Sequence, residues 1–324
     1  DLIQLLYYKF TETPLLKRMD AVKDYFIDSW ETLKGRNISE DDQEMLQMKF
    51  DKMYTTKDIY TIYNWMLDDC GCDLLPEVPY EKRKLPYEDV FPMLYLKYRL
   101  SGGNSTHKNI KHLVIDEMQD YTYLQYTILE SLFHCRMTIL GDRAQTLDTK
   151  QQDVLRFLPK LLGREIRTIE IKKSYRNTLE IARYAEKVSG VSDLELLDRH
   201  GKEVVEKTFN TDTELLDELV GHLKCPGDFE TAALITTTEE EAFDLSRLLK
   251  LRGINVSYVD RNSSAFKKGL TVTTFYLAKG LEFDQVFALR GAKENPLKNQ
   301  AEYICATRAL HELYVYEIAD SLSK

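Results

Sequence analysis

From residue 109 onward, short apolar runs alternate with longer amphipathic segments, and this alternation constrains the fold most strongly. Short apolar runs with polar ends are typical of buried strands, whereas the longer segments have helical spacing. Strands that alternate with helices need right-handed crossovers and therefore predict a parallel sheet in an α/β domain. The predicted strands are His112–Asp116, Met137–Leu140, Thr168–Ile171, Ala232–Thr236, Val256–Val259, Leu270–Thr274, Gln285–Leu289 and Leu313–Ile318, and the helices between them include 122–133, 151–162, 177–188, 239–252 and 299–309.

The first hundred residues have a different pattern, which predicts helices without strands. Apolar residues recur at helical spacing over 19–34, 56–70 and 87–100. Gly35 is expected to end the first of these helices, and Ser39, followed by three acidic residues, is expected to cap the next.

Composition narrows the class of protein. The net charge is −9, and the lack of a basic stripe argues against tight, sequence-independent binding to DNA. No apolar run is long enough to span a membrane, and no signal peptide opens the sequence. Cys70 and Cys72 have no second pair at metal-binding spacing, so a zinc site is not expected, and the scattered cysteines fit a reducing cytoplasm.

The segment LVIDEMQD at 113–120 contains the clearest chemical signal. Its apolar strand ends in Asp116 and Glu117, and the carboxyl ends of parallel strands are where ligands bind in such sheets. One carboxylate there can hold Mg²⁺ through its water shell while its neighbour orients an attacking water. The alternative interpretation is an acidic strand end exposed to solvent.

A second polar segment, GDRAQ at 141–145, follows the next predicted strand. By itself this segment is typical of an ordinary turn. Placed beside the carboxylates of the first strand, however, its polar side chains could sense the γ-phosphate of a nucleotide. The order of the two segments favours this second interpretation.

Together these segments resemble motifs of the superfamily 1A helicases of the UvrD/Rep type. DEMQD is similar to motif II and GDRAQ to motif III. SYR at 174–176, AKGLEFD at 278–284 and ATRA at 306–309 resemble motifs IV, V and VI. Five motifs in the right order imply RecA-like motor domains that hydrolyse ATP with Mg²⁺.

The resemblance implies a role for each residue of motifs II and III. Asp116 would position Mg²⁺ through water, and Glu117 would activate the attacking water. Gln145 would couple the γ-phosphate to movement between domains. Gln119 and Asp142 are further residues that the resemblance places at the nucleotide.

The later motifs would complete the nucleotide site from the second motor domain. Tyr175 would stack on the adenine, and Arg176 and Arg308 would stabilise the charge of the transition state at the γ-phosphate. Glu282 would contact the ribose. Gly280 would let the backbone approach closely.

One motif of the family is missing from the sequence. No Gly-x-x-x-x-Gly-Lys-Ser/Thr loop, which cradles phosphates in such enzymes, occurs in the chain, and the segment 102–108 has neither its spacing nor its Lys-Thr pair. Because the chain begins at Asp1 without Met, we expect it to be part of a longer protein whose preceding segment supplies this loop. The chain alone is then expected to hydrolyse little ATP.

A second departure concerns nucleic acid. The DNA-translocating members have base-stacking aromatic residues after motif III, where this chain has TLDT at 146–149, and a DNA-contacting His before motif V, where it has Tyr276 and Leu277. The combination YLAKGLEFD at 276–284 and the segment 87–97 resemble the HelD-type (helicase IV-like) branch. Its members act on RNA polymerase and use ATP to release it from nucleic acid.

The resulting prediction is a bacterial, cytoplasmic, helicase-like ATPase with three parts. Residues 1–108 are expected to form a helical insertion of the first motor domain. Residues 109–165 would complete that domain, and 166–324 would form the second. A 3′–5′ DNA helicase of the UvrD/Rep type and a degenerate, non-catalytic binding module are the alternatives, so RNA polymerase and DNA are both candidate partners.

Overall fold

The computed structural model describes residues 2–102, 109–147, 154–163, 166–191, 195–224, 229–263, 268–291 and 296–319. The chain separates into two compact units. The first comprises Asp1–Asp116, Tyr121–Leu140 and Val154–Glu165, and the second comprises Glu117–Asp120, Gly141–Asp153 and Ile166–Lys324. The short segments that follow the first two strands therefore belong to the second unit.

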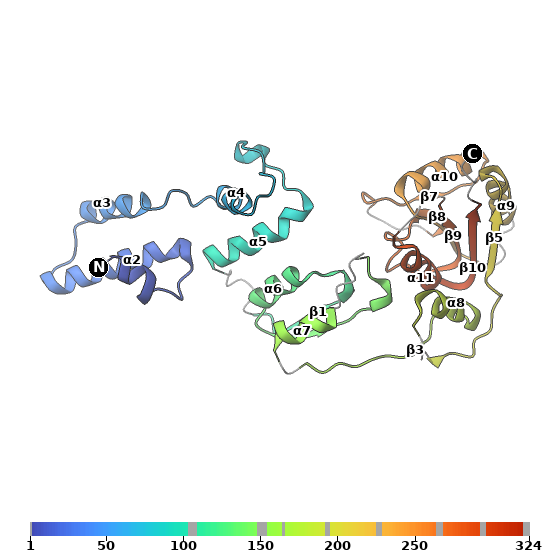
Figure 1. Cartoon of the computed structure of the whole chain (residues 1–324), viewed down its shortest axis with the longest axis horizontal. Helices are drawn as coiled ribbons and strands as arrows, with labels where there is room; N and C mark the ends of the chain where they lie inside the picture. The colour runs from blue at the N-terminus through green and yellow to red at the C-terminus, as the bar shows by residue number, and fades with distance from the viewer. Residues whose placement is uncertain are drawn as a thin grey trace. The chain divides into compact units, whose positions relative to one another are not determined.

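The first unit begins with helices, drawn in blue to cyan in Figure 1. They are α1 (Leu2–Gln4), the π-helix η1 (Leu5–Lys9), α2 (Leu15–Lys34), α3 (Glu40–Asp51), α4 (Ile59–Asp69), the 3₁₀ turn η2 (Tyr80–Lys82) and α5 (Tyr87–Ser101). The predicted ends are confirmed, because Gly35 follows α2 in the left-handed conformation and Ser39 Oγ accepts a hydrogen bond from the backbone N of Asp42. The helical prediction for the first hundred residues is therefore confirmed.

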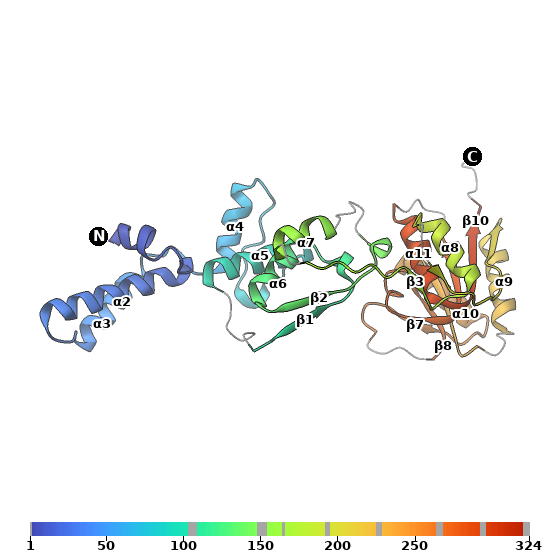
Figure 2. The same ribbon diagram turned by 90° about the horizontal axis from the view of Figure 1, so that it is seen from below.

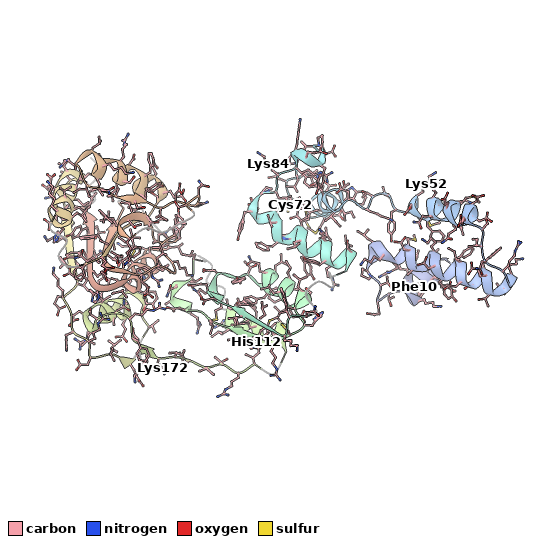
Figure 3. The ribbon with its side chains drawn as sticks, turned by 180° about the vertical axis from the view of Figure 1, so that it is seen from behind. Phe10, Lys52, Cys72, Lys84, His112 and Lys172 are labelled. Atoms are coloured by element: carbon pink, nitrogen blue, oxygen red, sulfur yellow. The ribbon has the colours of Figure 1, made fainter. Side chains whose placement is uncertain are left out.

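Tyrosines of α4 are built into a small core of their own. Tyr60 and Tyr63 are buried with Leu67 and Leu75. The hydroxyl of Tyr63 donates to Asp89 Oδ1 of α5 at 2.7 Å, which satisfies the one polar atom of the buried ring. Figure 3 labels Cys72, which lies just beyond the end of α4.

A parallel pair of strands, β1 (His112–Ile115) and β2 (Arg136–Ile139), completes the first unit. The pair runs in register from His112, labelled in Figure 3, opposite Arg136 to Ile115 opposite Ile139. Helices α6 (Tyr123–Leu132) and α7 (Val154–Leu162) pack on it, as Figure 2 shows.

The second unit contains a six-stranded, wholly parallel sheet in the order β5-β10-β9-β6-β8-β7. Its strands are β5 (Val205–Phe209), β6 (Thr231–Thr236), β7 (Ser257–Tyr258), β8 (Gly269–Thr274), β9 (Phe283–Arg290) and β10 (Ala309–Ile318). A separate two-stranded pair joins β3 (Lys173–Ser174) to β4 (Glu195–Leu196). The predicted α/β fold with a parallel sheet, expected for a RecA-like motor domain, is confirmed.

Helices cover both faces of this sheet (Figure 1). Alternate residues of each strand point to opposite faces, so Val286 and Ala288 pack with α8 (Leu179–Ser189) and α11 (Lys298–Arg308). Phe287, between them in sequence, packs with α9 (Asp212–Lys224) and α10 (Glu239–Leu251). The loop that follows β8 leads to the start of β9, and α11 runs directly into β10, so the end of α11 lies beside the amino-terminal ends of β9 and β10.

One predicted strand is wrong, and three strands, β3, β4 and β5, were not predicted. Residues 168–171 form no strand, because Ile169 and Ile171 are 70% and 78% exposed and pair with no neighbouring strand. One edge of the six-stranded sheet is β5, which sequence periodicity misses because its middle residues are exposed. The strand predicted at 256–259 is shorter, Ser257–Tyr258. No helix in the described ranges is long and apolar enough to cross a membrane.

Candidate functional site

The chain turns sharply at Glu117, the second residue after β1. Glu117 has φ 53°, the one positive value at a non-glycine residue in the described part of the chain. Such a conformation is rare for a residue with a side chain and marks a locally strained backbone. The turn continues into the 3₁₀ segment η4 (Met118–Asp120), and the Nε2 of Gln119 donates to Glu117 Oε2 at 2.7 Å.

Gly141, which follows β2, lets the two polar segments approach each other. A Cβ atom at Gly141 would lie 2.4 Å from Met118 Cγ and 2.5 Å from Gln119 Oε1, so no larger residue fits without displacement. The backbone N of Asp142 donates to Gln119 Oε1 at 3.1 Å. Close approach at Gly141 therefore joins the DEMQD and GDRAQ segments.

Asp142 is the centre of the second segment. Its Oδ1 accepts from the backbone N of Ala144, and its Oδ2 accepts from Gln145 Nε2 and from the hydroxyl of Tyr303 on α11, each at 2.9 Å. Burial, and then the Asp142 carboxylate, raise the pKa of Tyr303 above its ordinary value, so the hydroxyl remains a donor. In this way Asp142 fixes the side chain of Gln145.

Arg308, the last residue of α11, is 2% exposed. Its Nη2 donates to Gln145 Oε1 and Thr307 Oγ1, and its Nη1 donates to Leu281 O, each at 3.2 Å. Nε is buried and has no hydrogen-bond acceptor among the described residues. Burial, and then the positive charge of Arg176, lower the pKa of Arg308. A buried guanidinium with an unused donor beside a second guanidinium favours the binding of an anion.

Lys279 connects the DEMQD and GDRAQ segments to the loop after β8. Its Nζ lies 3.3 Å from Glu117 Oε2 and donates to Asp120 Oδ2 at 2.6 Å and to the carbonyl oxygen of Gln145 at 3.1 Å. Its side chain is only 7% exposed. The described residues thus form one connected network from Glu117 to Arg308.

The residues expected at the base and ribose are arranged more openly. Tyr175 is 62% exposed and lies outside the network just described. Arg176 Nε forms an ion pair with Glu282 Oε1 at 3.0 Å, so in this structure the carboxylate expected at the ribose holds an arginine. Gly280 has φ 82° and a Cβ there would meet open space, so the backbone conformation, not close approach, calls for glycine.

Asn177 holds the SYR segment against the end of α11. Its Nδ2 donates to the carbonyl oxygens of Ala306 at 3.2 Å and Ala309 at 2.6 Å, and the residue is buried. Ala306 O also accepts a hydrogen bond from the backbone N of Ala309, where α11 ends and β10 begins. Asn177 therefore fixes the backbone next to Arg176 close to the helix end that carries Arg308.

Sequence reasoning placed five residues that the structure joins into the network, namely Glu117, Gln119, Asp142, Gln145 and Arg308. Asp116, directly after β1, belongs to the first unit, where it ends the first of that unit's three segments. Four participants were not proposed as site residues, namely Asp120, Asn177, Lys279 and Tyr303. Asp120 and Lys279 lie inside the motif-like segments DEMQD and AKGLEFD, so the sequence could have identified them as site residues. No sequence pattern identifies Tyr303. The segment 103–108 and residues 148–149, on which other expectations rested, lie outside the described residues.

A pH-dependent contact lies three residues beyond Asn177, in the first turn of α8. Glu180 accepts from the His200 ring at 2.9 Å and from the backbone N of Gly201 at 2.8 Å. The hydrogen bond from His200 lowers the pKa of Glu180 to about 2. The same bond, followed by the charge of Asp198, raises the pKa of His200 above 6.5.

This contact predicts a window of pH for its contribution to stability. Because the pKa of Glu180 is lowered, its ionised carboxylate stabilises the folded chain above pH 4.5, and this stabilisation is lost as the pH falls toward 2. Because the pKa of His200 is raised, its protonated ring stabilises the folded chain below pH 6.5, and this stabilisation is lost as the pH rises through the pKa of His200 in the folded chain. Glu180→Gln should therefore lower the pKa of His200, measured by NMR titration of the ring protons, whereas Glu186→Gln on the same helix should not. An unchanged titration in Glu180→Gln would contradict the contact.

The chain is similar to parts of two solved helicase structures. The carboxyl-terminal domain of a possible DNA helicase from Lactobacillus plantarum WCFS1 is 26% identical, with a TM-score of 0.38 over 45% of this chain and 88% of that domain. The structure of PRRSV helicase is 17% identical, with a TM-score of 0.38 over 81% of this chain. The chain spans about half of that viral helicase, 46% of its length. No family model and no curated protein matches the chain.

Proposed function

We propose that the chain is part of a helicase-like motor that hydrolyses ATP. The observation that carries the proposal is the connected network in the second unit, from Glu117 through Gln119, Asp142 and Gln145 to Arg308. It combines a carboxylate able to activate water, an amide able to respond to a phosphate, and a buried cation. Phosphoryl transfer needs these groups, because its catalysis consists mainly of positioning and charge stabilisation.

The buried donor of Arg308 supports a nucleotide as the ligand. Nε of Arg308 has no acceptor among the described residues, and the neighbouring Arg176 disfavours its charge. A phosphate oxygen would supply both the acceptor and the compensating negative charge. Bound ATP with Mg²⁺ supplies the scissile phosphate bond and the metal charge, and Asp116 and Glu117 at the end of β1 would hold the metal and activate water.

The loop that grips the phosphates is proposed to lie in a segment encoded before Asp1. In the relatives that the motifs resemble, this loop precedes motif II, and the present sequence contains no copy of it. Activity is therefore a property to test on the product of the complete gene. The chain alone is expected to hydrolyse ATP slowly.

RNA polymerase is the proposed target, as in the HelD-type branch. The net charge of −9 gives little general attraction for a polyanion, and Tyr276 and Leu277 replace the expected DNA-contacting histidine. A DNA helicase of the UvrD/Rep type is the second candidate, favoured only by the motifs themselves. A degenerate binding module is disfavoured by the joint presence of Glu117, Arg176 and Arg308.

The test is the ATPase rate of the complete gene product, measured alone, with single-stranded DNA and with RNA polymerase at two salt concentrations. Stimulation by polymerase that exceeds stimulation by DNA supports the polymerase-directed motor. Strong stimulation by DNA alone, with a steep loss at high salt, would instead identify a translocating helicase. No ATP hydrolysis under any condition would leave the binding module as the function.

A further inference from the structure

Lys279 is a cation buried at the centre of the network, and its burial has to be compensated. Its side chain is 7% exposed, while those of its two carboxylate partners, Glu117 and Asp120, are 38% and 31% exposed. Removing an ammonium from water is costly unless charges and hydrogen bonds replace the lost solvent. Here two carboxylates and the carbonyl oxygen of Gln145 replace it.

The fold presents Lys279 at a fixed point. The turn after β8 is closed by hydrogen bonds from Ala278 N to Thr274 O at 2.9 Å and from Leu281 N to Ala278 O at 3.0 Å. Ala278 is fully buried in the core against α11, and Gly280 takes the left-handed conformation that the turn requires. The backbone on both sides of Lys279 is therefore constrained, so its side chain reaches the DEMQD segment from a rigid base.

We propose that Lys279 is a positioning residue for Glu117. The Oε2 atom of Glu117 meets two nitrogen donors, Gln119 Nε2 at 2.7 Å and Lys279 Nζ at 3.3 Å. Two donors on one carboxylate oxygen restrict the rotation of the side chain and direct the other oxygen. This restraint matters more because the backbone at Glu117 is strained and would, without contacts that hold it, relax to another conformation.

Lys279 also ties Glu117 to the residue that contacts Arg308. Its Nζ bonds the backbone carbonyl of Gln145, whose side chain bonds Arg308. The proposal rests on the ATPase function proposed above, since a positioned general base has a measurable role only if hydrolysis occurs. It goes beyond that function by assigning the orientation of the base to one lysine.

The test uses the complete gene product with three substitutions. Lys279→Met removes the cation, Lys279→Gln keeps a hydrogen-bond donor without the charge, and Lys279→Arg keeps the charge. Lys298→Met is the matched control, because Lys298 is 57% exposed and its nearest carboxylate, on Glu317, lies 3.6 Å away. For each protein, kcat and KM for ATP, the affinity for a fluorescent ATP analogue and the thermal unfolding midpoint are measured.

Lys279→Met is expected to lower kcat by about 10- to 100-fold, because misplacing a reacting group by about 1 Å costs that much. KM and analogue affinity should change less than about threefold, because the lysine contacts protein groups and not the nucleotide. Lys279→Gln should fall between wild type and Lys279→Met, and Lys279→Arg should recover most of kcat. Lys298→Met should stay within about twofold, as expected for an exposed ion pair.

Two controls separate the failure of this inference from failure of the proposed function. If wild type hydrolyses ATP and Glu117→Gln does not, but Lys279→Met is unchanged, only the positioning role is overturned. A rise of kcat in Lys279→Met would also overturn it, because the lysine would then restrain the enzyme. If wild type shows no hydrolysis, the ATPase proposal itself fails. Should Lys279→Met not fold, a wild-type kcat in a folded Lys279→Gln together with an impaired Lys279→Arg overturns the charge-based role.

Discussion

Arg308→Ala should lower kcat for ATP hydrolysis by about 10³-fold or more in the complete gene product, as removal of an arginine finger does. The substitution removes the buried guanidinium and also leaves Gln145 Oε1 without the donor it has here. Under the proposed function, both losses would act at the point where charge develops during phosphoryl transfer. Single-turnover hydrolysis of radiolabelled ATP at saturating protein measures this step directly.

The arginine prediction has a graded control. Arg308→Lys keeps the charge but cannot make the three hydrogen bonds of the guanidinium to Leu281, Gln145 and Thr307, so it should remain strongly impaired. Arg247→Ala, whose side chain is 66% exposed on α10, should leave the rate unchanged. A loss smaller than about tenfold in Arg308→Ala would remove the residue from the chemistry, given the usual effect of arginine fingers.

Glu117→Gln should reduce kcat by about 10²- to 10⁴-fold, the usual contribution of a general base. The amide keeps the shape of the side chain and can still accept from Gln119, so the fold should persist, and nucleotide affinity should change little. Rapid-quench measurement of the chemical step, paired with equilibrium binding of a fluorescent analogue, separates the two effects. Glu240→Gln, at an exposed position on α10, is the control for loss of one acidic charge. Retained hydrolysis in Glu117→Gln would place the base elsewhere.

The sequence predicts which candidate residues lie close together where chain order determines proximity. Glu117 and Asp142 each follow a strand, and the strands are parallel neighbours, so their ends had to meet. Arg308 is the last residue of α11, which leads into β10, the strand between β5 and β9 in the six-stranded sheet. For such residues, the order of the motifs and the parallel topology are sufficient to predict that they lie close together.

The same reasoning fails where contacts depend on the direction of a side chain or on whether a segment has a strand to pair with. The hydroxyl of Tyr303 reaches Asp142 only because α11 presents that face to the GDRAQ segment, and an aromatic residue on a helix is usually a core residue. The apolar pattern at 168–171 predicts a strand, but a strand needs a neighbour to pair with, and periodicity does not report whether one exists. The reverse holds for β5: its middle residues are exposed and give no apolar pattern, yet it pairs with β10 as an edge strand.

The left-handed backbone at Glu117 has a consequence for how this chain could change by mutation. Glycine adopts φ 53° without steric cost, and asparagine tolerates it better than most residues. A population of variants sorted for resistance to unfolding should therefore accumulate glycine or asparagine at position 117. A population sorted for turnover should retain glutamate. The two selective pressures oppose each other at this one residue, so its occupant indicates which of them has acted.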